Sequence, residues 1–520
     1  MKKDLLWKVT GSALSLFLLA ANFVTAAPAE KHAYLVGMVH GASAKALAAP
    51  GIEVKEQWDK LDATLIEASP AAAQGLSHNP NVTYVEDDRI VHATKVTTKS
   101  TAYTDAAYTW GLQAVNAQAA WSLGATGQNI KVCVLDTGID YGQPEFVRGG
   151  VSVIKASKNF IKDGHPDATD GYGHGTHVAG TIVGQTSNSG SRIGVAPGVD
   201  LYIARVLGDD GTGATSGIIN GLNWCQQNGA KIASLSLGSD RGSKTEQKAF
   251  DQAYQNGMLS IAASGNDSGP IGYPAKYSSV VAVGAIDNSL NLATFSNFGA
   301  EQEVVAPGVG TLSSVPRGTG MLPSASENGT VYKSGAVEYS PYGNVNGPLV
   351  ECGLADSTTS CANKPASGSW IALISRGSIA FSDKITNAIA QGASAAIITN
   401  NDTANPDDAG SFTLGAAGNW IPTISVSYNN GVSIRSNTLG SGNVTVNKWD
   451  YAYYEGTSMA TPHVSAVAAL AWSANPNLTN KQIRSILQQS AKDLGAAGWD
   501  SSFGYGLVQA DAAVRLAKGN

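Results

Sequence analysis

Short apolar runs alternate with amphipathic segments over most of this chain. Four runs predict strands buried on both faces: 131–135, 232–237, 259–263 and 280–283. Two segments between them have the spacing of helices: 174–183 and 217–227. Near the C-terminus, Thr479 and Gln482 have the spacing of a capping box that opens another helix. Strands that alternate with helices predict an α/β fold built on a parallel sheet.

The alternation stops between residues 317 and 450, where Ser, Asn and Gly are abundant. This stretch separates two parts that both carry candidate chemistry, which favours an inserted domain over a long loop. Upstream, a mixed segment is followed by a small, polar one with the composition of a linker open to proteolysis. The predicted organisation is therefore a leader at 1–26, a small domain at 31–93, a linker at 94–106, and a main domain formed by 107–316 and 451–520 around the insertion at 317–450.

The leader has the pattern of a secretory signal. Positive charge at Lys2 and Lys3 precedes an apolar run at 13–21 and small residues at 24–26. A membrane anchor is the alternative, but the run is short for a bilayer. The net charge of −6 gives no footprint for nucleic acid or an anionic membrane surface. We expect a secreted, extracellular protein with no nucleic-acid partner and no stable membrane association.

Export permits disulfides, and the four cysteines allow three pairings. Cys352 and Cys361 flank a short polar stretch, where a bridge would contribute roughly 3 kcal/mol on the loop-entropy model. Cys133 lies in a strand-like run and Cys225 in a helix-like one. Two buried free thiols are the alternative for this pair. We favour the two bridges Cys133–Cys225 and Cys352–Cys361.

Three glycine-framed segments carry candidate chemistry. Asp136 ends a predicted strand, at the edge where open α/β sheets bind ligands, although a solvated turn aspartate is the simpler interpretation of this residue alone. His174 opens a predicted helix, and its glycines allow close approach of backbone and substrate. With His177 it could instead form half of a zinc site, but no cluster of further ligands accompanies the pair. We expect His177 to pack within the helix.

Ser458 lies between Gly456 and a predicted helix. A serine there can simply be an N-cap. The same position offers an exposed hydroxyl as nucleophile and a backbone N–H aimed at a developing oxyanion. The order Asp136, His174, Ser458 is one of the known chain orders of serine triads and suggests nucleophilic acyl transfer.

Three blocks resemble the signature segments of subtilisin-like serine proteases: Asp136-Thr137-Gly138-Ile139-Asp140, His174-Gly175-Thr176-His177-Val178-Ala179-Gly180, and Gly456-Thr457-Ser458-Met459-Ala460-Thr461-Pro462-His463-Val464. The resemblance runs from about residue 110 to the C-terminus, without the interruption. It implies a three-layer subtilisin-like α/β fold, with Ser458 as nucleophile, His174 as general acid and base, and Asp136 orienting the imidazole. The segment 262–266 resembles the family's oxyanion block, which makes Asn266 the side-chain donor, although Asn266 alone suits an ordinary turn.

The resemblance also implies which residues contact the substrate. They are Gly211, Thr212, Gly213, Ser236, Leu237, Gly238, Ala263, Ser264 and Gly265. The first three would pair with an extended substrate. Thr215 stands where many relatives carry a bulky aromatic residue, which predicts an open S4 pocket. Small S1 walls without charge predict broad cleavage after apolar or medium-sized residues.

Family members often bind structural calcium, so we expect Ca²⁺ with Glu145 as one ligand. The loop 185–192 differs from the usual calcium loop, and Asp163, Asp167 and Asp170 offer another set of hard oxygens, although acidic turn residues are more often solvated.

Two further segments resemble known modules. The segment that ends at 85–93 resembles the small α+β inhibitory propeptide of these enzymes, and cleavage is expected between residues 93 and 106. The segments 347–352, 371–377, 384–388 and 392–398 resemble a mainly-β protease-associated domain. The resemblance therefore implies a monomeric, self-processing endopeptidase whose partners are protein or peptide substrates and its own propeptide, with the inserted domain gating or positioning substrates.

Two alternatives belong to other classes. A catalytically silent binding protein would use the inserted domain to hold partners, but such a protein should have lost at least one of Asp136, His174, Ser458 and Asn266. A secreted esterase would carry its serine in Gly-x-Ser-x-Gly ahead of the acid and the base, and neither condition holds.

Overall fold

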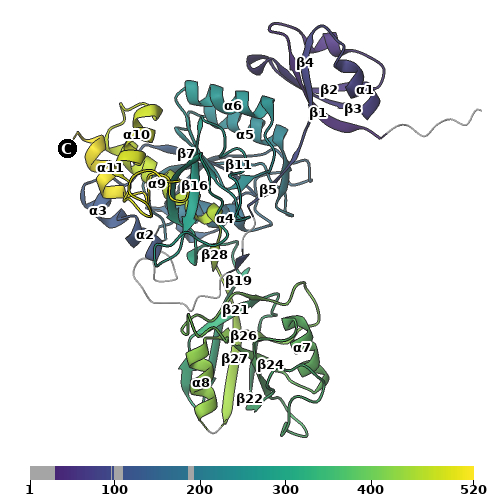
Figure 1. Ribbon diagram of the computed structural model, residues 1–520, viewed down its shortest axis with the longest axis vertical. Helices are drawn as coiled ribbons and strands as arrows, with labels where there is room; N and C mark the ends of the chain where they lie inside the picture. Colours follow the sequence, from purple (N-terminus) through teal and green to yellow (C-terminus); the bar gives the residue numbers. More distant parts are fainter. Residues whose placement is uncertain (1–29, 95–96, 99–108, 186–192, 438, 520) are drawn as a thin grey trace, which may run out of the picture. The chain divides into compact units, whose positions relative to one another are not determined.

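The computed structural model describes residues 30–94, 97–98, 109–185, 193–437 and 439–519 (Figure 1). Contacts divide the described chain into two units. The first unit comprises residues 30–57 and 64–87, and all remaining described residues form the second. Residues 88–93, which the sequence analysis assigns to the small domain, group with the second unit because they pair with its strands.

The first unit is a small α+β fold. Its core brings Val36 and Leu47 together with Ile66 and Leu76. Ser69 begins the helix by accepting a hydrogen bond from the Ala72 N–H, and Pro70 occupies the first turn, where no amide is needed. The sheet has the order β2-β3-β1-β4. Its elements are β1 His32–Met38, β2 Ile52–Trp58, β3 Ala63–Ala68, β4 Val82–Asp87, α1 Pro70–Leu76 and the 3-10 turn Ala44–Leu47. Residues 58–63, which include the 3-10 turn Asp59–Leu61 between β2 and β3, group with the second unit.

A seven-stranded parallel sheet of order β10-β11-β7-β13-β15-β16-β17 forms the centre of the second unit. The four predicted strands are its members β7, β13, β15 and β16, which confirms the parallel α/β prediction. Nearly all of their residues are buried, as expected for strands covered on both faces. The bounds are β7 Lys131–Asp136, β10 Ile154–Asn159, β11 Asp200–Arg205, β13 Ile232–Leu235, β15 Leu259–Ala263, β16 Val280–Ile286 and β17 Gln302–Pro307.

Helices cover both faces of this sheet and give three layers (Figure 1). Successive residues of β7 alternate between the layers: Val132 and Val134 belong to the core around α9, whereas Cys133 is bonded to Cys225 of α5. The elements of these layers are α4 His174–Val183, α5 Thr215–Gln227, α6 Lys244–Gln255, α9 Thr457–Ala474, α10 Asn480–Ser490 and α11 Ala510–Ala517, with the shorter α2 Trp110–Ala114 and α3 Ala117–Ser122.

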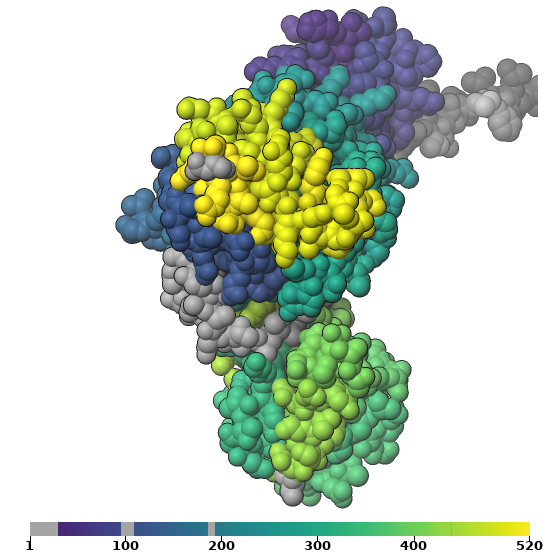
Figure 2. Space-filling view, turned by 60° about the vertical axis from the view of Figure 1, so that its left-hand side comes forward, coloured from purple at the N-terminus to yellow at the C-terminus, as the bar shows by residue number. Residues whose placement is uncertain are grey.

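The C-terminal helices complete the core around α9. The predicted capping box is present, since the Thr479 hydroxyl accepts from the Gln482 N–H and the Gln482 side chain accepts from the Thr479 N–H. Helix α11 packs against α3 and α9, and the C-terminal residues form a continuous surface beside the segment that carries α3 (Figure 2). This arrangement ties the end of the chain to the start of the main domain.

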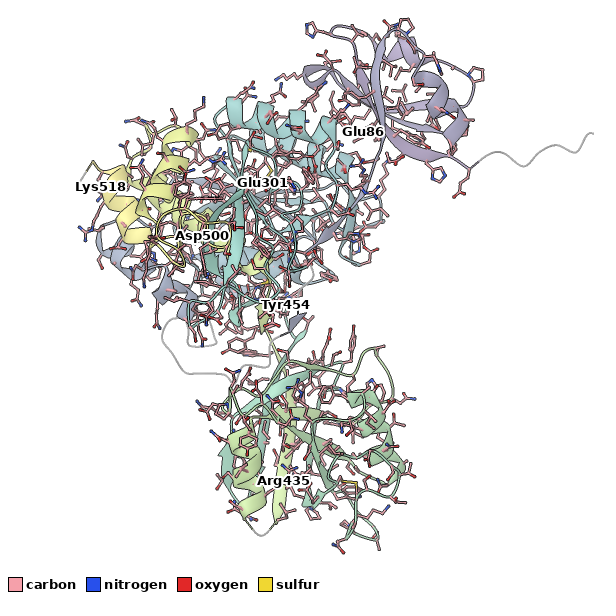
Figure 3. All side chains as sticks on the ribbon, in the orientation of Figure 1. Glu86, Glu301, Arg435, Tyr454, Asp500 and Lys518 are labelled. Atoms are coloured by element: carbon pink, nitrogen blue, oxygen red, sulfur yellow. A yellow bond between two sulfur atoms is a disulfide. The ribbon has the colours of Figure 1, made fainter. Side chains whose placement is uncertain are left out.

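The insertion lies between β18 Thr311–Ser314 and β28 Tyr451–Glu455, which pair antiparallel. It forms a nine-stranded mixed sheet of order β20-β19-β27-β22-β23-β24-β26-β21-β25 with helices α7 Phe381–Ala390 and α8 Tyr428–Ser436. Its strands are β19 Gly320–Glu327, β20 Thr330–Tyr332, β21 Ser334–Glu338, β22 Gly343–Glu351, β23 Ile371–Ser375, β24 Ala395–Thr399, β25 Phe412–Thr413, β26 Thr423–Val426 and β27 Ser441–Trp449. Arg435 of α8, labelled in Figure 3, forms an ion pair with Glu351 and ties this helix to the sheet.

Both expected disulfides, Cys133–Cys225 and Cys352–Cys361, are present. Small elements complete the second unit: β5 Ile90–Ala93, β6 Thr97–Thr98, β8 Val147–Arg148, β9 Val151–Ser152, β12 Thr212–Ala214, β14 Leu237–Gly238 and the 3-10 turn Pro144–Phe146. Within the described ranges, none of the helices has both the length and the apolar character needed to cross a membrane.

Candidate active site

Asp136 and His174 meet at the carboxyl edge of the sheet. Asp136 is the last residue of β7, and His174 is the first residue of α4. The His174 Nδ1 donates to Asp136 Oδ1 at 2.7 Å, and both side chains are buried. The Thr137 N–H also donates to Asp136 Oδ1, at 2.7 Å. A carboxylate that accepts from Nδ1 fixes the imidazole in the tautomer whose Nε2 can take a proton.

Gly175 allows this pair to approach. A Cβ on Gly175 would lie 2.3 Å from the Gly138 main-chain oxygen and 3.2 Å from the Asp136 Cβ. No larger residue fits there without moving the backbone, so the glycine next to His174 has the role that the sequence analysis expected of it.

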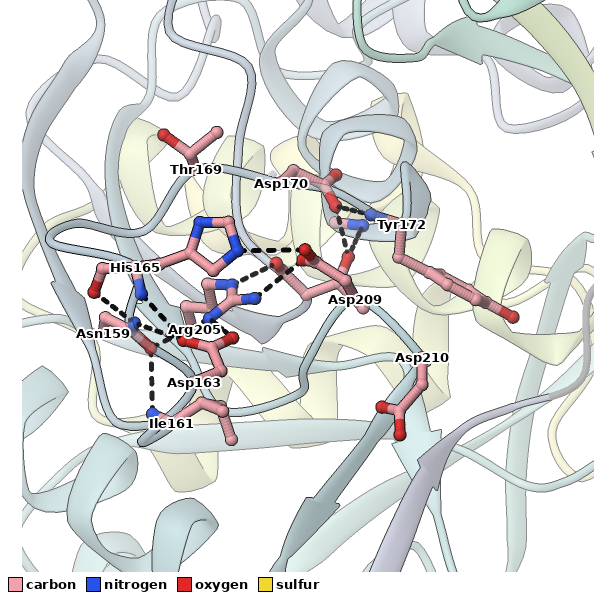
Figure 4. A network of polar contacts seen from close by, with 12 residues as sticks. Asn159, Ile161, Asp163, His165, Thr169, Asp170, Tyr172, Arg205, Asp209 and Asp210 are labelled. Carbon is pink, nitrogen blue, oxygen red and sulfur yellow. Dashed lines mark hydrogen bonds and ion pairs between the residues drawn. The ribbon is translucent and has the colours of Figure 1, made fainter.

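Asp170 holds the two loops of the pair together. Its carboxylate accepts from the Thr137 hydroxyl at 2.9 Å, from the Gly173 N–H at 2.7 Å and from the Thr176 N–H at 2.9 Å, and part of this network appears in Figure 4. The Thr137 hydroxyl in turn accepts from the Gly175 N–H at 2.8 Å. The sequence analysis assigned Asp170 only to a possible set of metal ligands. An aspartate just before a glycine-framed helix start is a capping signal that could have indicated its position.

Ser458 is the second residue of α9 and is fully buried. The prediction that its hydroxyl is exposed is therefore wrong. Its Oγ donates to the Ser236 main-chain oxygen at 3.0 Å, and the Ser236 hydroxyl donates to the Ser458 main-chain oxygen at 2.8 Å. The His174 Nε2 is buried and has no hydrogen-bond partner among the described residues. The hydrogen bond between serine and histidine is therefore not formed here.

Thr94, the residue after strand β5, binds the same main-chain oxygen as Ser458. The Thr94 N–H and the Thr94 hydroxyl both donate to the same Ser236 oxygen, each at 3.3 Å. One carbonyl oxygen therefore binds both Ser458 and Thr94, which brings the main chain of Thr94 close to the serine hydroxyl. The family resemblance named Ser236 as a substrate contact, but the sequence did not indicate that its main-chain oxygen is the acceptor.

Asn266 is anchored by the residue that precedes Ser458. Its Oδ1 accepts from the Thr457 N–H at 2.9 Å and from the Thr457 hydroxyl at 2.8 Å, and the Gly265 N–H donates to the same hydroxyl at 3.2 Å. These bonds fix the carboxamide plane at the N-terminus of α9, with the amide nitrogen as its donating half. The sequence analysis did not single out Thr457.

The nine residues expected to contact substrate surround strand β5. This strand pairs antiparallel with β12 on one side and β14 on the other. The Gly211 oxygen accepts from the Ala93 N–H at 2.8 Å, and Gly213 lies opposite Val91. Ala263, Ser264, Gly265 and Gly238 line a cavity of about 890 Å³ together with Thr94 and Asn266. Tyr172, which the sequence analysis did not name, also lines it beside Gly211.

Two further histidines are buried behind the site. The His177 Nε2 lies 3.1 Å from the main-chain oxygens of Thr311 and Ala452, and its ring stacks on Tyr454. This confirms that His177 packs within the structure. Burial lowers the pKa of His177 from 6.5 to about 3 and that of His463 to about 4. Both imidazoles are therefore neutral at physiological pH.

Glu145, the expected calcium ligand, is buried, and its carboxylate accepts a hydrogen bond from the Tyr451 hydroxyl. A buried carboxylate has the hard oxygens that Ca²⁺ prefers, but Ca²⁺ takes six to eight of them. The remainder of the loop that was considered for calcium, 186–192, lies outside the described residues.

The second set of expected ligands is not brought together. Asp167 accepts from Thr169, and Asp170 is used as described above. Asp163 lies instead with His165 and Asp209, around the buried Arg205 guanidinium, 2.5 Å from Asp163 and 2.7 Å from Asp209 (Figure 4). Arg205 already supplies positive charge in this cluster, and within the described residues Asp163, Asp167 and Asp170 are not grouped as one set of ligands.

The parallel sheet lies between two layers of helices and carries an Asp–His pair, a buried serine and an anchored asparagine at its carboxyl edge. This combination defines a serine hydrolase of the α/β class. The subtilase family profile matches residues 127–338 and 364–506. Alkaline elastase YaB of Bacillus sp. (strain YaB) is 32% identical over 465 residues, which cover 89% of this chain and 82% of that protein. M-protease of Shouchella clausii (strain KSM-K16) is 41% identical over 280 residues, 54% of this chain and 68% of that protein.

A solved structure agrees with these relatives. The crystal structure of the psychrophilic subtilisin-like protease Apa1 from the Antarctic psychrotroph Pseudoalteromonas sp. AS-11 is 30% identical, with a TM-score of 0.59 over 78% of this chain and 96% of that one. The chain belongs to the subtilase family and is a serine endopeptidase.

The buried histidines predict a loss of stability in acid. Unfolded histidines bind a proton near pH 6.5, whereas folded His177 and His463 do so only near pH 3 and 4. The unfolded state therefore binds more protons below pH 6.5, and each histidine lowers the free energy of unfolding by about 1.4 kcal/mol per pH unit. Calorimetry of the Ser458→Ala chain from pH 7 to 4.5 should show the free energy of unfolding falling with pH by the sum of the two contributions. Adding His463→Gln should reduce this slope by about 1.4 kcal/mol per pH unit. An unchanged slope would exclude His463 as a source.

Proposed function

We propose that the chain is a secreted, self-processing endopeptidase that cleaves proteins through an acyl-enzyme on Ser458. The observation that carries this proposal is the shared acceptor: Thr94 and Ser458 both donate to the Ser236 main-chain oxygen. The proposal makes the Thr94 carbonyl, in the same residue as this N–H, the group that Ser458 attacks. The chain itself thus supplies a segment bound in the manner of a substrate.

In this mechanism the Ser458 Oγ turns from Ser236 toward His174, whose Nε2 takes its proton as the oxygen attacks the carbonyl carbon. The Asp136 carboxylate stabilises the resulting imidazolium through the 2.7 Å bond to Nδ1. The Asn266 amide and main-chain N–H groups at the start of α9 stabilise the oxyanion. His174 then gives its proton to the leaving amine, and water hydrolyses the acyl-enzyme by the same steps in reverse order.

The Asn266 role predicts a defined kinetic defect. Asn266→Leu removes the donor that meets charge only in the transition state, so kcat should fall about 10²–10³-fold, a magnitude taken over from subtilisin, with KM little changed. Thr457→Val keeps the donor but removes one bond that anchors it, and should cost less. Steady-state kinetics on one peptide substrate compares the two variants. A rise in KM without loss of kcat for Asn266→Leu would contradict the role.

The register of β5 supports the Thr94–Lys95 bond as the processing site. The Ala93 N–H donates to Gly211 and the Thr94 N–H to Ser236, so these two residues occupy the last positions before the nucleophile. Val91 is 2% exposed and lies opposite Gly213, whereas His92 is exposed. The medium-sized Thr94 in a cavity with small walls agrees with broad specificity for apolar or medium-sized residues.

Processing is expected to depend on Val91 and not on its neighbour. Val91→Asp would bury a carboxylate and should slow conversion of the precursor about 100-fold. His92→Asp, the matched control, places the same charge on the exposed face of the same strand and should process normally. Gel densitometry follows conversion, and N-terminal sequencing should find Lys95 first. Another first residue would refute the assigned bond.

The N-terminal region is proposed to act as an inhibitory propeptide. Trp58 donates to the Asn220 side chain on α5, and the side chains of Lys248 and Gln252 on α6 donate to the main-chain oxygens of Leu61 and Lys60. The Asp88 carboxylate accepts from the N–H and the hydroxyl of Ser216 at the start of α5. These contacts support a segment that remains bound after cleavage and blocks the site.

The remaining assignments are proposals of the same kind. The insertion is assigned as a protease-associated domain on its sequence resemblance and mainly-β sheet, and the leader as a secretory signal. Calcium, with Glu145 as a ligand, would supply structural stabilisation only. The mature enzyme is proposed to be a monomer.

The direct test uses the purified chain, a fluorophosphonate probe and casein. The wild type should incorporate the probe and digest casein. Failure to do either would overturn the proposed function.

A further inference from the structure

Arg205 lies directly beside the proposed catalytic acid. It is the last residue of β11, and its register partner on β7 is Asp136. Its side chain is fully buried, so its positive charge has to be matched by acceptors from the protein. The acyl-transfer steps do not involve this guanidinium, and its place at the carboxyl edge of the sheet therefore needs a separate explanation.

The guanidinium binds acceptors at the ends of three neighbouring strands. Its Nε donates to the Thr137 main-chain oxygen at 3.1 Å, immediately after β7. Its Nη1 donates to Asn159 Oδ1 at 3.2 Å, at the end of β10, and pairs with Asp163 Oδ2 at 2.5 Å. Its Nη2 donates to Asp209 Oδ1 at 2.7 Å, in the loop after β11 (Figure 4). Because a guanidinium is planar and rigid, these bonds fix the relative positions of the segments that supply the acceptors.

The bond to Thr137 acts on the catalytic pair. The Thr137 N–H donates to Asp136 Oδ1, and the Thr137 hydroxyl accepts from the Gly175 N–H, next to His174. Arg205 holds the remaining polar group of this residue, its main-chain oxygen. Loss of that bond would let Thr137 move, and the 2.7 Å contact between Asp136 and His174 would change with it.

The bond to Asp209 acts on the proposed substrate edge. Asp209 comes two residues before Gly211, whose main-chain oxygen accepts from the Ala93 N–H at 2.8 Å. The other carboxylate oxygen of Asp209 lies 3.0 Å from His165 Nε2. A Cβ on Gly171 would lie 2.3 Å from the Asp209 Cγ, so this glycine leaves room for the carboxylate. The segment that leads into β12 is therefore tied to the buried guanidinium.

We propose that Arg205 is a positioning residue that holds the catalytic acid and the substrate-binding strand β12 in a fixed relation to each other. It acts through two separate bonds, one to Thr137 and one to Asp209. This inference deepens the proposed function and rests on the roles proposed there for Asp136 and Gly211. Because the two bonds are separate, their losses should have different kinetic signatures, in kcat for Thr137 and in KM for Asp209.

Arg205→Lys is expected to lower kcat and to leave KM within about twofold. A lysine keeps the positive charge but has no rigid fork, so its ammonium should pair with Asp163 and Asp209 while the Thr137 oxygen loses its donor. The substrate is the peptide 89–98 of this chain, which contains the sequence of β5 and the proposed processing bond. For the mature enzyme kcat should fall about tenfold, and labelling by a small fluorophosphonate should slow by the same factor.

Asp209→Ala is expected to give the opposite division. It releases the segment that leads into β12 but keeps the bond between Arg205 and Thr137. KM for the same peptide should therefore rise about fivefold, with kcat and the labelling rate within about twofold of the wild type. Gly171→Ala should give the same result, because its methyl group would displace the Asp209 carboxylate.

Arg148→Lys is the matched control. Arg148 donates to the main-chain oxygens of Pro197 and Val199 and pairs with Asp200 at 3.0 Å. Asp200 is the first residue of β11, at the opposite end of the strand from Arg205. The control variant loses bonds of the same kinds, and both kcat and KM should stay within about twofold of the wild type.

The kinetic results decide the proposal in each case. Equal falls of kcat in Arg148→Lys and Arg205→Lys, or an unchanged kcat and labelling rate in Arg205→Lys, would overturn it. If Arg205→Lys does not fold, the other two variants decide, and an unchanged KM in Asp209→Ala and Gly171→Ala would overturn it. A wild type that cleaves no peptide and incorporates no probe would instead refute the proposed function.

Discussion

Ser458→Ala is expected to abolish both processing and proteolysis. The variant loses the only atom that can form the acyl-enzyme in the proposed mechanism, so kcat should fall about 10⁶-fold, a magnitude taken over from subtilisin. The chain should accumulate as the uncleaved precursor and should not react with a fluorophosphonate probe. Gel analysis, probe labelling and casein digestion measure the three effects.

Ser465→Ala provides the matched control for this change. Ser465 is a buried serine of the same helix, and its hydroxyl bonds to the Ser234 hydroxyl at 2.9 Å, away from His174. It should process and label like the wild type. Addition of a trace of active enzyme should cut the Ser458→Ala precursor at the processing bond alone, and resistance of the product to further digestion would show that it has folded. Self-conversion of the Ser458→Ala precursor at the wild-type rate would disprove the nucleophile assignment.

Asp136→Asn is expected to lower kcat by about 10⁴-fold while leaving the fold intact, the magnitude known for the same change in another serine protease. The 2.7 Å bond requires Nδ1 to donate and leaves Nε2 as the base. An asparagine amide can donate to Nδ1 instead, which puts the proton on Nε2 and removes the base. Initial rates on one peptide substrate measure kcat, and thermal unfolding checks the fold.

Asp140→Asn is the control for this prediction, since Asp140 lies in the same loop. Its carboxylate binds Gly142 and Arg317 and does not contact His174. Its loss should change kcat less than tenfold on a short peptide. Equal losses for the two variants would indicate that Asp136 acts through loop structure and not through the tautomer of His174.

The sequence predicted the main elements well because their signals are local. Buried parallel strands are uniformly apolar, so β7, β13, β15 and β16 were visible as runs, and α4 was found between its flanking glycines. The small strands β12 and β14 carry no such signal, since three residues such as Thr212–Ala214 are too short for a pattern. They were reached only through the family resemblance.

The functional site shows a similar division. The candidates whose side chains carry chemistry came from their motifs, and Ser236 came from the family resemblance, whereas the contacts of Asp170 and Thr457 were missed. Asp170 was interpreted as a metal candidate because the sequence of an acidic turn is the same whether the carboxylate binds a metal or accepts hydrogen bonds from protein groups. In the structure its carboxylate is saturated by protein donors, which leaves no need for a cation.

The sequence by itself determined the class of chemistry, the layered α/β fold and the identities of the acid, base and serine candidates, since these depend on residue type and short-range pattern. Only the tertiary structure decided that Ser458 is buried, that it shares an acceptor with Thr94, and that β28 pairs with Thr97 and Thr98. These features depend on the register between segments far apart in sequence, around residues 94, 236 and 458. Register is set by the packing of the whole domain, and no local pattern encodes it.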